Sequence, residues 1–466
     1  MGMRCGAVFA ALLASTATLA SAANDALDPH FGAGGVALFG ATPVSARRLM
    51  RPRGLAVQTD GKLLLAGATD GLTVDPNPVS TLVPAVARLN ADGSWDESFG
   101  DHGIYAFPGS AAVSTYGGEG NQVVVVSDGS IVAAGETYTQ LPGNEVHSCT
   151  LLFKLGAGGT LDTTFGTDGS LCFDFAPEPP GTTYFDHFES IAAGAGDQLY
   201  LTTADTNLST GAVARFMPDG TLDGSYGTGG IATSSDDALF TVLSLLPDER
   251  VVATGGAVTY RFTDAGVPDP TFGIGGESVI DFGSYTPTYA AWSALDGAGR
   301  LISGLYSFAG PPSSFMVSRI GADGTLDAAF NGAQQQPGFP GFAAVPLQAG
   351  SLVLAAMPTA GGIFAVGVLD LMGNTIGLVR LDVDASFDES FGDPTQRGWT
   401  ALRIGTDADS YNVPYGAAKD GAGRVYVSAV FTGSNLGGNC DGIIRFVPDD
   451  LFNDGLDPLP VRTCPP

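Results

Sequence analysis

Basic side chains are scarce in this chain. Its 466 residues include 20 lysines and arginines against 48 aspartates and glutamates, a formal net charge of −28 at pH 7. A nucleic-acid interface needs clustered positive charge, so the composition excludes that class of partner. Charged residues amount to only 15% and apolar residues to 44%, which excludes a disordered acidic tail and predicts a packed core.

Sequence patterns of enzymes are also missing or weak. Four histidines occur, His30, His102, His147 and His187, and none lies in an H-E-x-x-H motif that would hold zinc. The chain has no G-x-S-x-G motif and no phosphate-binding loop. Glycan cleavage by two carboxylates stays open, because 48 acidic residues do not single out a pair. We therefore predict no catalytic residue, no metal and no cofactor, with a secreted glycan hydrolase or lyase as the alternative.

Residues 1–23 have the features of an export signal. Arg4 precedes the apolar run from Ala7 to Leu13, and the segment ends in small residues typical of a cleavage site near Ala22. An ordinary N-terminal helix is the alternative. No later stretch of 18 apolar residues occurs, so we expect no membrane span. The sequence thus predicts a secreted protein, periplasmic or extracellular, and we expect a monomer.

Glycine and proline are abundant, with 67 and 29 residues, which predicts many short strands joined by turns. An L-D-x-x-F-G motif recurs along the chain, each time after a basic residue, and divides the chain into seven units of about 60 residues. The repeated residues of six units are Arg88, Asp96 and Phe99; Lys154, Asp162 and Phe165; Arg215, Asp223 and Tyr226; Arg261, Asp269 and Phe272; Arg319, Asp327 and Phe330; Arg380, Asp388 and Phe391. Arg445 marks the seventh, degraded unit.

Each unit contains four short apolar runs bounded by turn residues, such as the hairpin dipeptide Asp128-Gly129. This pattern predicts an all-β fold, a seven-bladed β-propeller of four-stranded antiparallel blades, with an open β-solenoid as the alternative. The predicted blades cover about 33–91, 101–157, 167–218, 228–264, 274–322, 332–383 and 394–448 of a single domain, 24–466, with a C-terminal tail at 449–466. Because Leu27 to Gly32 repeat the linker motif, we expect the two termini to meet after the last blade.

The L-D-x-x-F-G motif has a structural interpretation. Its Asp can cap its own turn, its Gly can adopt a positive φ, and its aromatic ring can wedge between successive blades. The functional alternative is a ring of carboxylates that binds cations. A propeller, however, spreads equivalent positions around its circumference, so they cannot converge on one ion.

The segments Val57 to Gly67 and Arg88 to Gly103 resemble the delta-60 repeat, a bacterial repeat also catalogued as a propeller domain of unknown function. The resemblance covers essentially the whole chain after residue 23. It implies a secreted or surface β-propeller and no particular reaction.

Four cysteines follow the signal segment, and in an oxidising compartment an even number predicts two disulfides. Cys149 and Cys172 are 23 residues apart, Cys440 and Cys464 are 24 apart, and each pair brackets the same repeat landmark. This spacing favours Cys149–Cys172 and Cys440–Cys464 over the other pairings, with reduced buried thiols as the alternative. We expect the first bond to join neighbouring blades and the second to close the ring.

Loop lengths predict two different faces. The Asp-Gly turns and the L-D-x-x-F-G linkers share one face, and the long variable connections share the other, where binding usually resides. The candidate ligand-binding residues are aromatic residues of these connections: Tyr184, Phe185, Tyr285, Tyr289, Tyr306, Tyr411 and Tyr415. We expect them to bind an extracellular protein or polysaccharide, the alternative being that the rings only pack down their own loops.

Overall fold

The computed structural model describes residues 27–39, 49–70, 82–108, 117–140, 146–175, 188–203, 210–235, 238–283, 289–306, 315–333, 336–347, 351–359, 361–369, 375–392, 397–404, 411–433 and 438–447. All the regular elements in these residues are β-strands. None of the described residues forms a helix of the length and apolar character that crossing a bilayer requires.

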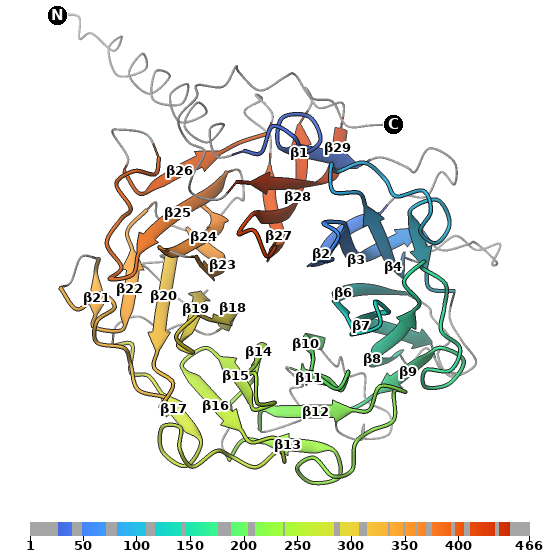
Figure 1. Ribbon diagram of the computed structural model, residues 1–466, viewed down its shortest axis with the longest axis horizontal. Helices are drawn as coiled ribbons and strands as arrows, with labels where there is room; N and C mark the ends of the chain where they lie inside the picture. The colour runs from blue at the N-terminus through green and yellow to red at the C-terminus, as the bar shows by residue number, and fades with distance from the viewer. Residues whose placement is uncertain are drawn as a thin grey trace, which may run out of the picture.

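Seven antiparallel sheets surround a central axis (Figure 1). Blade 1 contains β2 (Met50–Val57), β3 (Leu63–Asp70), β4 (Leu82–Leu89) and β5 (Ile104–Ala106). Blade 2 contains β6 (Gly117–Val125), β7 (Ile131–Gln140), β8 (Val146–Leu155) and β9 (Ser170–Phe173). Blade 3 contains β10 (Phe188–Ala193), β11 (Leu199–Thr203), β12 (Ala212–Phe216) and β13 (Ile231–Thr233). Blade 4 contains β14 (Val242–Leu245), β15 (Val251–Gly255), β16 (Val258–Phe262) and β17 (Glu277–Val279). Blade 5 contains β18 (Tyr289–Leu295), β19 (Leu301–Tyr306), β20 (Phe315–Ile320), β22 (Phe342–Val345) and β21 (Gly338–Phe339). Blade 6 contains β23 (Leu352–Pro358), β24 (Gly362–Val368), β25 (Ile376–Asp382) and β26 (Trp399–Leu402). Blade 7 contains β27 (Asn412–Lys419), β28 (Val425–Gly433), β29 (Gly438–Phe446) and β1 (Val36–Phe39).

The seven-bladed propeller predicted from the sequence is therefore confirmed, and the open solenoid is wrong. Blade 5 carries a short fifth strand, β21, beyond the expected four. The first strand of each blade lies nearest the axis, and these seven inner strands contact one another in a ring (Figure 1). Hydrophobic cores fill the space between neighbouring blades, as where Leu63 and Leu65 of blade 1 pack with Tyr426 and Ile443 of blade 7.

The strand membership of the blades differs from the predicted unit limits. The run at residues 104–106 was expected to open the second unit, but it pairs with β4 as the outer strand of blade 1. The same offset applies to β1, which was expected in the first unit and is instead the outer strand of blade 7. An outer strand directly follows a linker in sequence, so the repeat period alone cannot say which of its two flanking sheets it joins.

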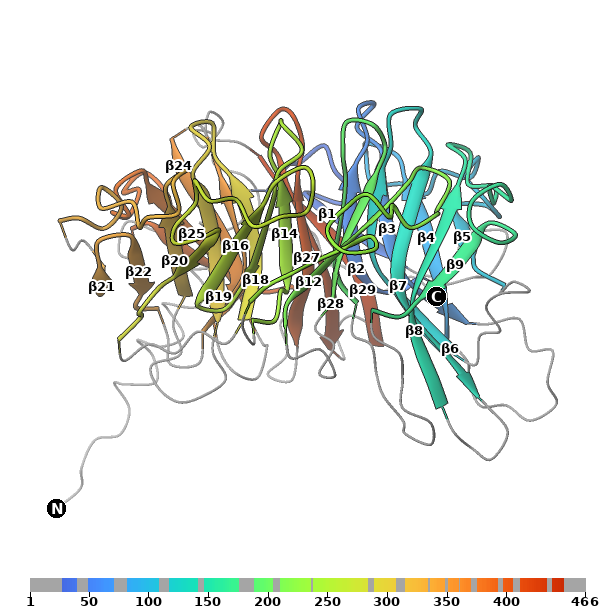
Figure 2. The same ribbon diagram turned by 90° about the horizontal axis from the view of Figure 1, so that it is seen from below.

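The two faces of the ring are distinct. The Asp-Gly turns after the inner strands and the L-D-x-x-F-G linkers lie on one side, which we call the turn face and which is the upper edge in Figure 2. The connections from each second strand to the third, and from each outer strand to the next blade, leave from the opposite side, the loop face. Much of the loop-face sequence lies outside the described residues.

A recurring cluster of side chains joins neighbouring blades on the turn face. In blade 4 the Arg261 Nε donates to the Asp269 carboxylate at 2.8 Å, and the guanidinium lies over the Phe272 ring with Cζ 4.7 Å from its centroid. The Arg261 Nη1 also donates to the carbonyl of Ala322 in blade 5. Asp269 caps its own turn by accepting from the backbone N–H and the hydroxyl of Thr271, at 2.9 and 2.7 Å.

We call this arrangement the arginine latch. It recurs with Arg88, Asp96, Phe99 and the Ala157 carbonyl; Arg215, Asp223, Tyr226 and the Asp264 carbonyl; Arg319, Asp327, Phe330 and the Val383 carbonyl. Arg380, Asp388 and Phe391 repeat the ion pair and the ring contact, and Lys154 lies 3.6 Å from Asp162. The aromatic ring packs on the turn glycine of the next blade, and a Cβ on Gly159 would lie 2.8 Å from the Phe99 ring. Asp269 thus caps its turn, and the Phe99 ring packs against the next blade.

The ring closes through the N-terminal segment. Arg445 of blade 7 pairs with Asp28 at 2.8 Å and lies over the Phe31 ring, and its Nη1 donates to the carbonyl of Ala91 in blade 1. β1 then pairs with β29, with Val36 opposite Ile444. The N-terminal linker motif thus occupies the position that follows blade 7. The C-terminal end that was expected to meet it lies outside the described residues.

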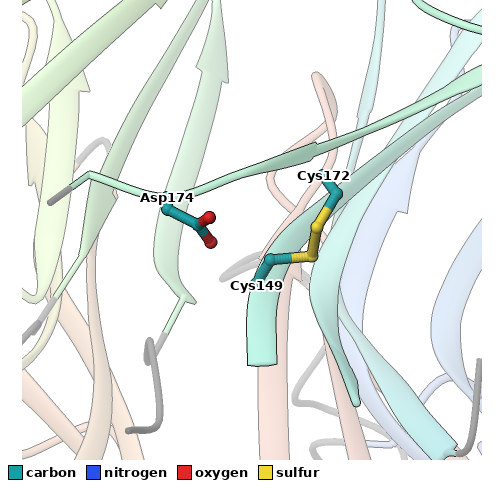
Figure 3. Close-up of side chains that lie close together, drawn as sticks. All are labelled: Cys149, Cys172 and Asp174. Atoms are coloured by element: carbon teal, nitrogen blue, oxygen red, sulfur yellow. A yellow bond between two sulfur atoms is a disulfide. The ribbon is translucent and has the colours of Figure 1, made fainter. Parts of the chain in front are cut away.

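Cys149 and Cys172 form a disulfide with Cα atoms 5.6 Å apart (Figure 3). The expected pairing is confirmed, but the expectation that it joins neighbouring blades is wrong, because β8 and β9 are adjacent strands of one sheet. Asp174 lies beside the two sulfurs, which are bonded to each other and so offer no thiolate to a metal. Cys440 is also disulfide-bonded, and its expected partner Cys464 lies outside the described residues.

The latch predicts a large cost for removing one buried charge. The Arg261 and Asp269 side chains are only 4% and 5% exposed, and Asp269 is also paired at 2.9 Å with Arg250, which is 30% exposed. Arg261→Leu should therefore leave the buried carboxylate with only this more exposed cation and lower the free energy of unfolding by about 3 kcal/mol. The matched control is Arg397→Leu, because Arg397 and Glu389 are 59% and 70% exposed, and it should change stability by less than about 0.5 kcal/mol. Urea denaturation measures both, and equal losses would contradict the latch.

The disulfide predicts a second stability effect. Cys149→Ala with Cys172→Ala frees a loop of 23 residues and should lower the free energy of unfolding by about 3 kcal/mol in the chain-entropy model. Urea denaturation of the double variant and the oxidised parent measures the difference. A change below about 1 kcal/mol would show that the surrounding sheet already restrains this segment.

Candidate functional site

A cavity of about 490 Å³ lies in the central channel. All seven inner strands contribute to its wall, including Arg53 from β2, Gln122 from β6, Glu189 from β10, Trp292 from β18 and Tyr415 from β27. The cavity is thus the place where segments far apart in the sequence converge.

The inner strands owe their channel-facing residues to β-bulges. Six of the seven inner strands have a register irregularity, and in every case but β2 it leaves a single residue unpaired. The unpaired residues are Asn121, Glu189, Ala291, Leu354 and Tyr415; in β2 the irregularity spans residues 51–53. A bulge re-aims the side chain of its extra residue, and four of these five line the cavity.

The bulge at Glu189 is fixed by the neighbouring blade. The Gln122 side chain donates to the backbone carbonyl of Glu189 at 3.0 Å and accepts from the backbone N–H of Ile191 at 2.9 Å. These two backbone groups lie at the bulge, and the side-chain amide of Gln122 forms a hydrogen bond with each of them. In the same way the Thr241 hydroxyl donates to the carbonyl of Ala290, beside the next bulge, at 2.8 Å. The channel surface is therefore preorganised by bonds between inner strands.

Glu189 has an unusual electrostatic environment. Burial raises the pKa of its carboxyl to about 8, and the nearby negative charge of Glu136 on β7 raises it in the same direction. Glu189 is therefore protonated over most of the neutral range. A carboxyl with a pKa near neutrality in a cavity is typical of a functional site.

An aromatic pair forms part of the wall beside this carboxyl. The rings of Tyr289 and Tyr306 are stacked, with centroids 5.5 Å apart and planes inclined by 21°. Burial raises the pKa of Tyr306 to about 12, with further contributions from the charges of Glu189 and Tyr289. Tyr306 therefore remains a neutral phenol at physiological pH. The stacked rings present an apolar surface with polar edges, which suits a flat polar ligand.

The structure brings together some of the predicted binding residues. Tyr289, Tyr306 and Tyr415 line the cavity, and Tyr411 is exposed at the start of the segment that leads into β27. Tyr184, Phe185 and Tyr285 lie outside the described residues. Glu189 and Gln122 were missed by sequence analysis, since neither stands in a motif. A bulge within an otherwise alternating inner strand was the one signal that could have found them.

The cavity combines polar and aromatic groups. Its wall includes the Glu189 carboxyl, the Gln122 amide and the stacked rings of Tyr289 and Tyr306. Convergent polar groups beside an aromatic surface are typical of a small-molecule site.

One family model matches part of the chain. The family model described as "Domain of unknown function (DUF5122) beta-propeller" matches residues 58–99 and 127–165. The solved structure of the polysaccharide lyase Uly1 is 9% identical with a TM-score of 0.45, covering 86% of this chain and 90% of that one. A protein of unknown function from Dyadobacter fermentans DSM 18053 is 13% identical with a TM-score of 0.41, covering 90% and 100%. No curated protein sequence matches the chain, and likenesses of this level carry no conclusion about function.

The raised pKa of Glu189 predicts a pH-dependent stability. The folded-state pKa of about 8 lies above the ordinary value of 4.5, so the folded state binds the proton more tightly and stability falls as pH rises from 4.5 through 8. Glu189→Gln removes this loss, and its melting temperature relative to the parent should therefore increase from pH 5 to pH 9. Differential scanning calorimetry at both pH values measures the difference, with a substitution of an exposed glutamate, Glu97→Gln, as the control. A constant difference for Glu189→Gln would contradict the raised pKa.

Proposed function

We propose that this chain is a secreted β-propeller that binds a saccharide in its central channel. The observation that carries the proposal is the cavity of about 490 Å³ in which the stacked Tyr289 and Tyr306 lie near Glu189. Its volume is in the range of ligand pockets, and sugar rings stack well on aromatic faces while their hydroxyls bond to carboxyl and amide groups. The export signal predicted from the sequence and the disulfide support an extracellular or periplasmic site of action.

A second candidate function is supported by the state of Glu189. A carboxyl that holds its proton near neutral pH can act as a general acid, and the phenol of Tyr306 is a second proton donor in the same cavity. These groups would suit a glycan hydrolase or lyase. Incubating a bound glycan with the protein and separating the products distinguishes the two functions, because a binding module returns the glycan intact.

The channel site predicts which tyrosine matters for binding. On a glycan array, Tyr306→Ala should weaken the affinity for the captured glycan by about tenfold, because the substitution removes one ring of the stacked pair. The matched control is Tyr411→Ala, a tyrosine that is 40% exposed and not part of the cavity wall; it should bind normally. If Tyr411→Ala abolishes capture and Tyr306→Ala does not, the ligand binds on the loops and not in the channel. Circular dichroism of Tyr306→Ala establishes that it is folded.

A further inference from the structure

The channel cavity holds an acidic group whose charge the protein leaves uncompensated. Burial and the charge of Glu136 both raise the pKa of Glu189. Glu136 comes from β7 of blade 2 and Glu189 from β10 of blade 3, so two neighbouring blades bring two carboxyls to one region. No described cation is among the groups that act on Glu189, so a bound positive charge would relieve both the burial and the repulsion.

The other groups on the cavity wall also suit a cation. Tyr289 and Tyr306 present a stacked pair of rings, and Trp292 and Tyr415 add two further aromatic rings. Aromatic faces attract ammonium groups through their quadrupoles, and the attraction strengthens where water is displaced. The net charge of −28 gives a field that draws cations to the protein.

The shape of the site is a second feature, independent of its charge. Bulges in two inner strands place Glu189 and Tyr415 on the cavity wall, and Gln122 holds the backbone around Glu189 through hydrogen bonds of 3.0 and 2.9 Å. The wall therefore offers a positioned carboxyl and aromatic faces in one cavity of about 490 Å³.

We propose that the saccharide bound in the channel is an amino sugar, whose ammonium group pairs with the Glu189 carboxylate while its ring lies against the aromatic wall. This inference rests on the proposed saccharide-binding function and names its ligand class. Arg53 lies on β2, two inner strands from β10 around the ring, so the ammonium group would bind on the Glu189 side of the cavity.

Binding of a cation beside Glu189 must displace its proton. The titratable and charged groups around this carboxyl are Glu136 from β7, Tyr289 and Tyr306 from β18 and β19, and, along the wall, Arg53 from β2 and Tyr415 from β27. At pH 6 Tyr306 is a neutral phenol and Glu189 is protonated, whereas a sugar amine is already an ammonium ion. Pairing with the ammonium favours the ionised carboxylate, so about one proton is released to the buffer for each ligand bound.

Isothermal titration calorimetry of the full chain with a β-linked glucosamine oligosaccharide at pH 6 tests this inference. Repeating the titration in two buffers of different ionisation enthalpy gives the number of protons released. We expect release of about one proton with the parent and none with Glu189→Gln, and an affinity at least about tenfold weaker for that variant. Glu97→Gln, an exposed carboxyl on the turn face, is the matched control and should behave as the parent.

The N-acetylated form of the same oligosaccharide separates the two proposals, since it has the same rings and no positive charge. Tighter binding of the glucosamine form, lost in Glu189→Gln, supports the amino-sugar inference. Equal or tighter binding of the N-acetylated form, or of a uronic-acid oligosaccharide, overturns it and leaves saccharide binding in place. If none of these oligosaccharides binds the parent, both the inference and the proposed function fail.

Discussion

The buried ion pair of the arginine latch is the interaction on which the rest of this structure depends. A single guanidinium bonds to the carboxylate of its own linker, lies over that linker's aromatic ring and donates to a carbonyl of the next blade. At five blade junctions, those of Arg88, Arg215, Arg261, Arg319 and Arg445, one blade therefore fixes the position of the next through a charged group that water cannot easily replace. The repeat of this contact around the turn face holds the inner strands at the distance that leaves a channel.

Closure of the ring uses the same chemistry with residues from the opposite end of the chain. Asp28 forms the ion pair with Arg445, and Phe31 provides the ring beneath its guanidinium. The Asp and the aromatic residue of an ordinary linker make the same two contacts with the other arginines. β1 then completes blade 7 by pairing with β29. The last blade is thus stabilised by a segment that is distant in sequence. The N-terminal linker motif is as necessary to the fold as any linker motif within the repeats.

Much of the fold could be predicted from the sequence because the latch residues recur at a fixed spacing. Arg261, Asp269 and Phe272 stand at the same offsets as Arg88, Asp96 and Phe99, and this period defines both the number of blades and the turn face. Sheet membership was harder, since β5 follows the linker in sequence yet pairs backward with β4. The disulfide was assigned to a seam between blades for the same reason, although β8 and β9 share a sheet.

The candidate site is where prediction from the repeat reaches its limit. Three of its tyrosines were found by their loop positions, but Glu189 and Gln122 carry no motif, and their importance arises only when strands from blades 2 and 3 meet at the axis. The bulges occur at the same level in the inner strands, so the fold determines where a side chain enters the channel. The residue at that point varies from Asn121 to Glu189, Leu354 and Tyr415, because the latch on the turn face does not constrain it. A repeat that keeps its scaffold constant on one face and leaves the bulge positions free can therefore change its ligand without changing its fold.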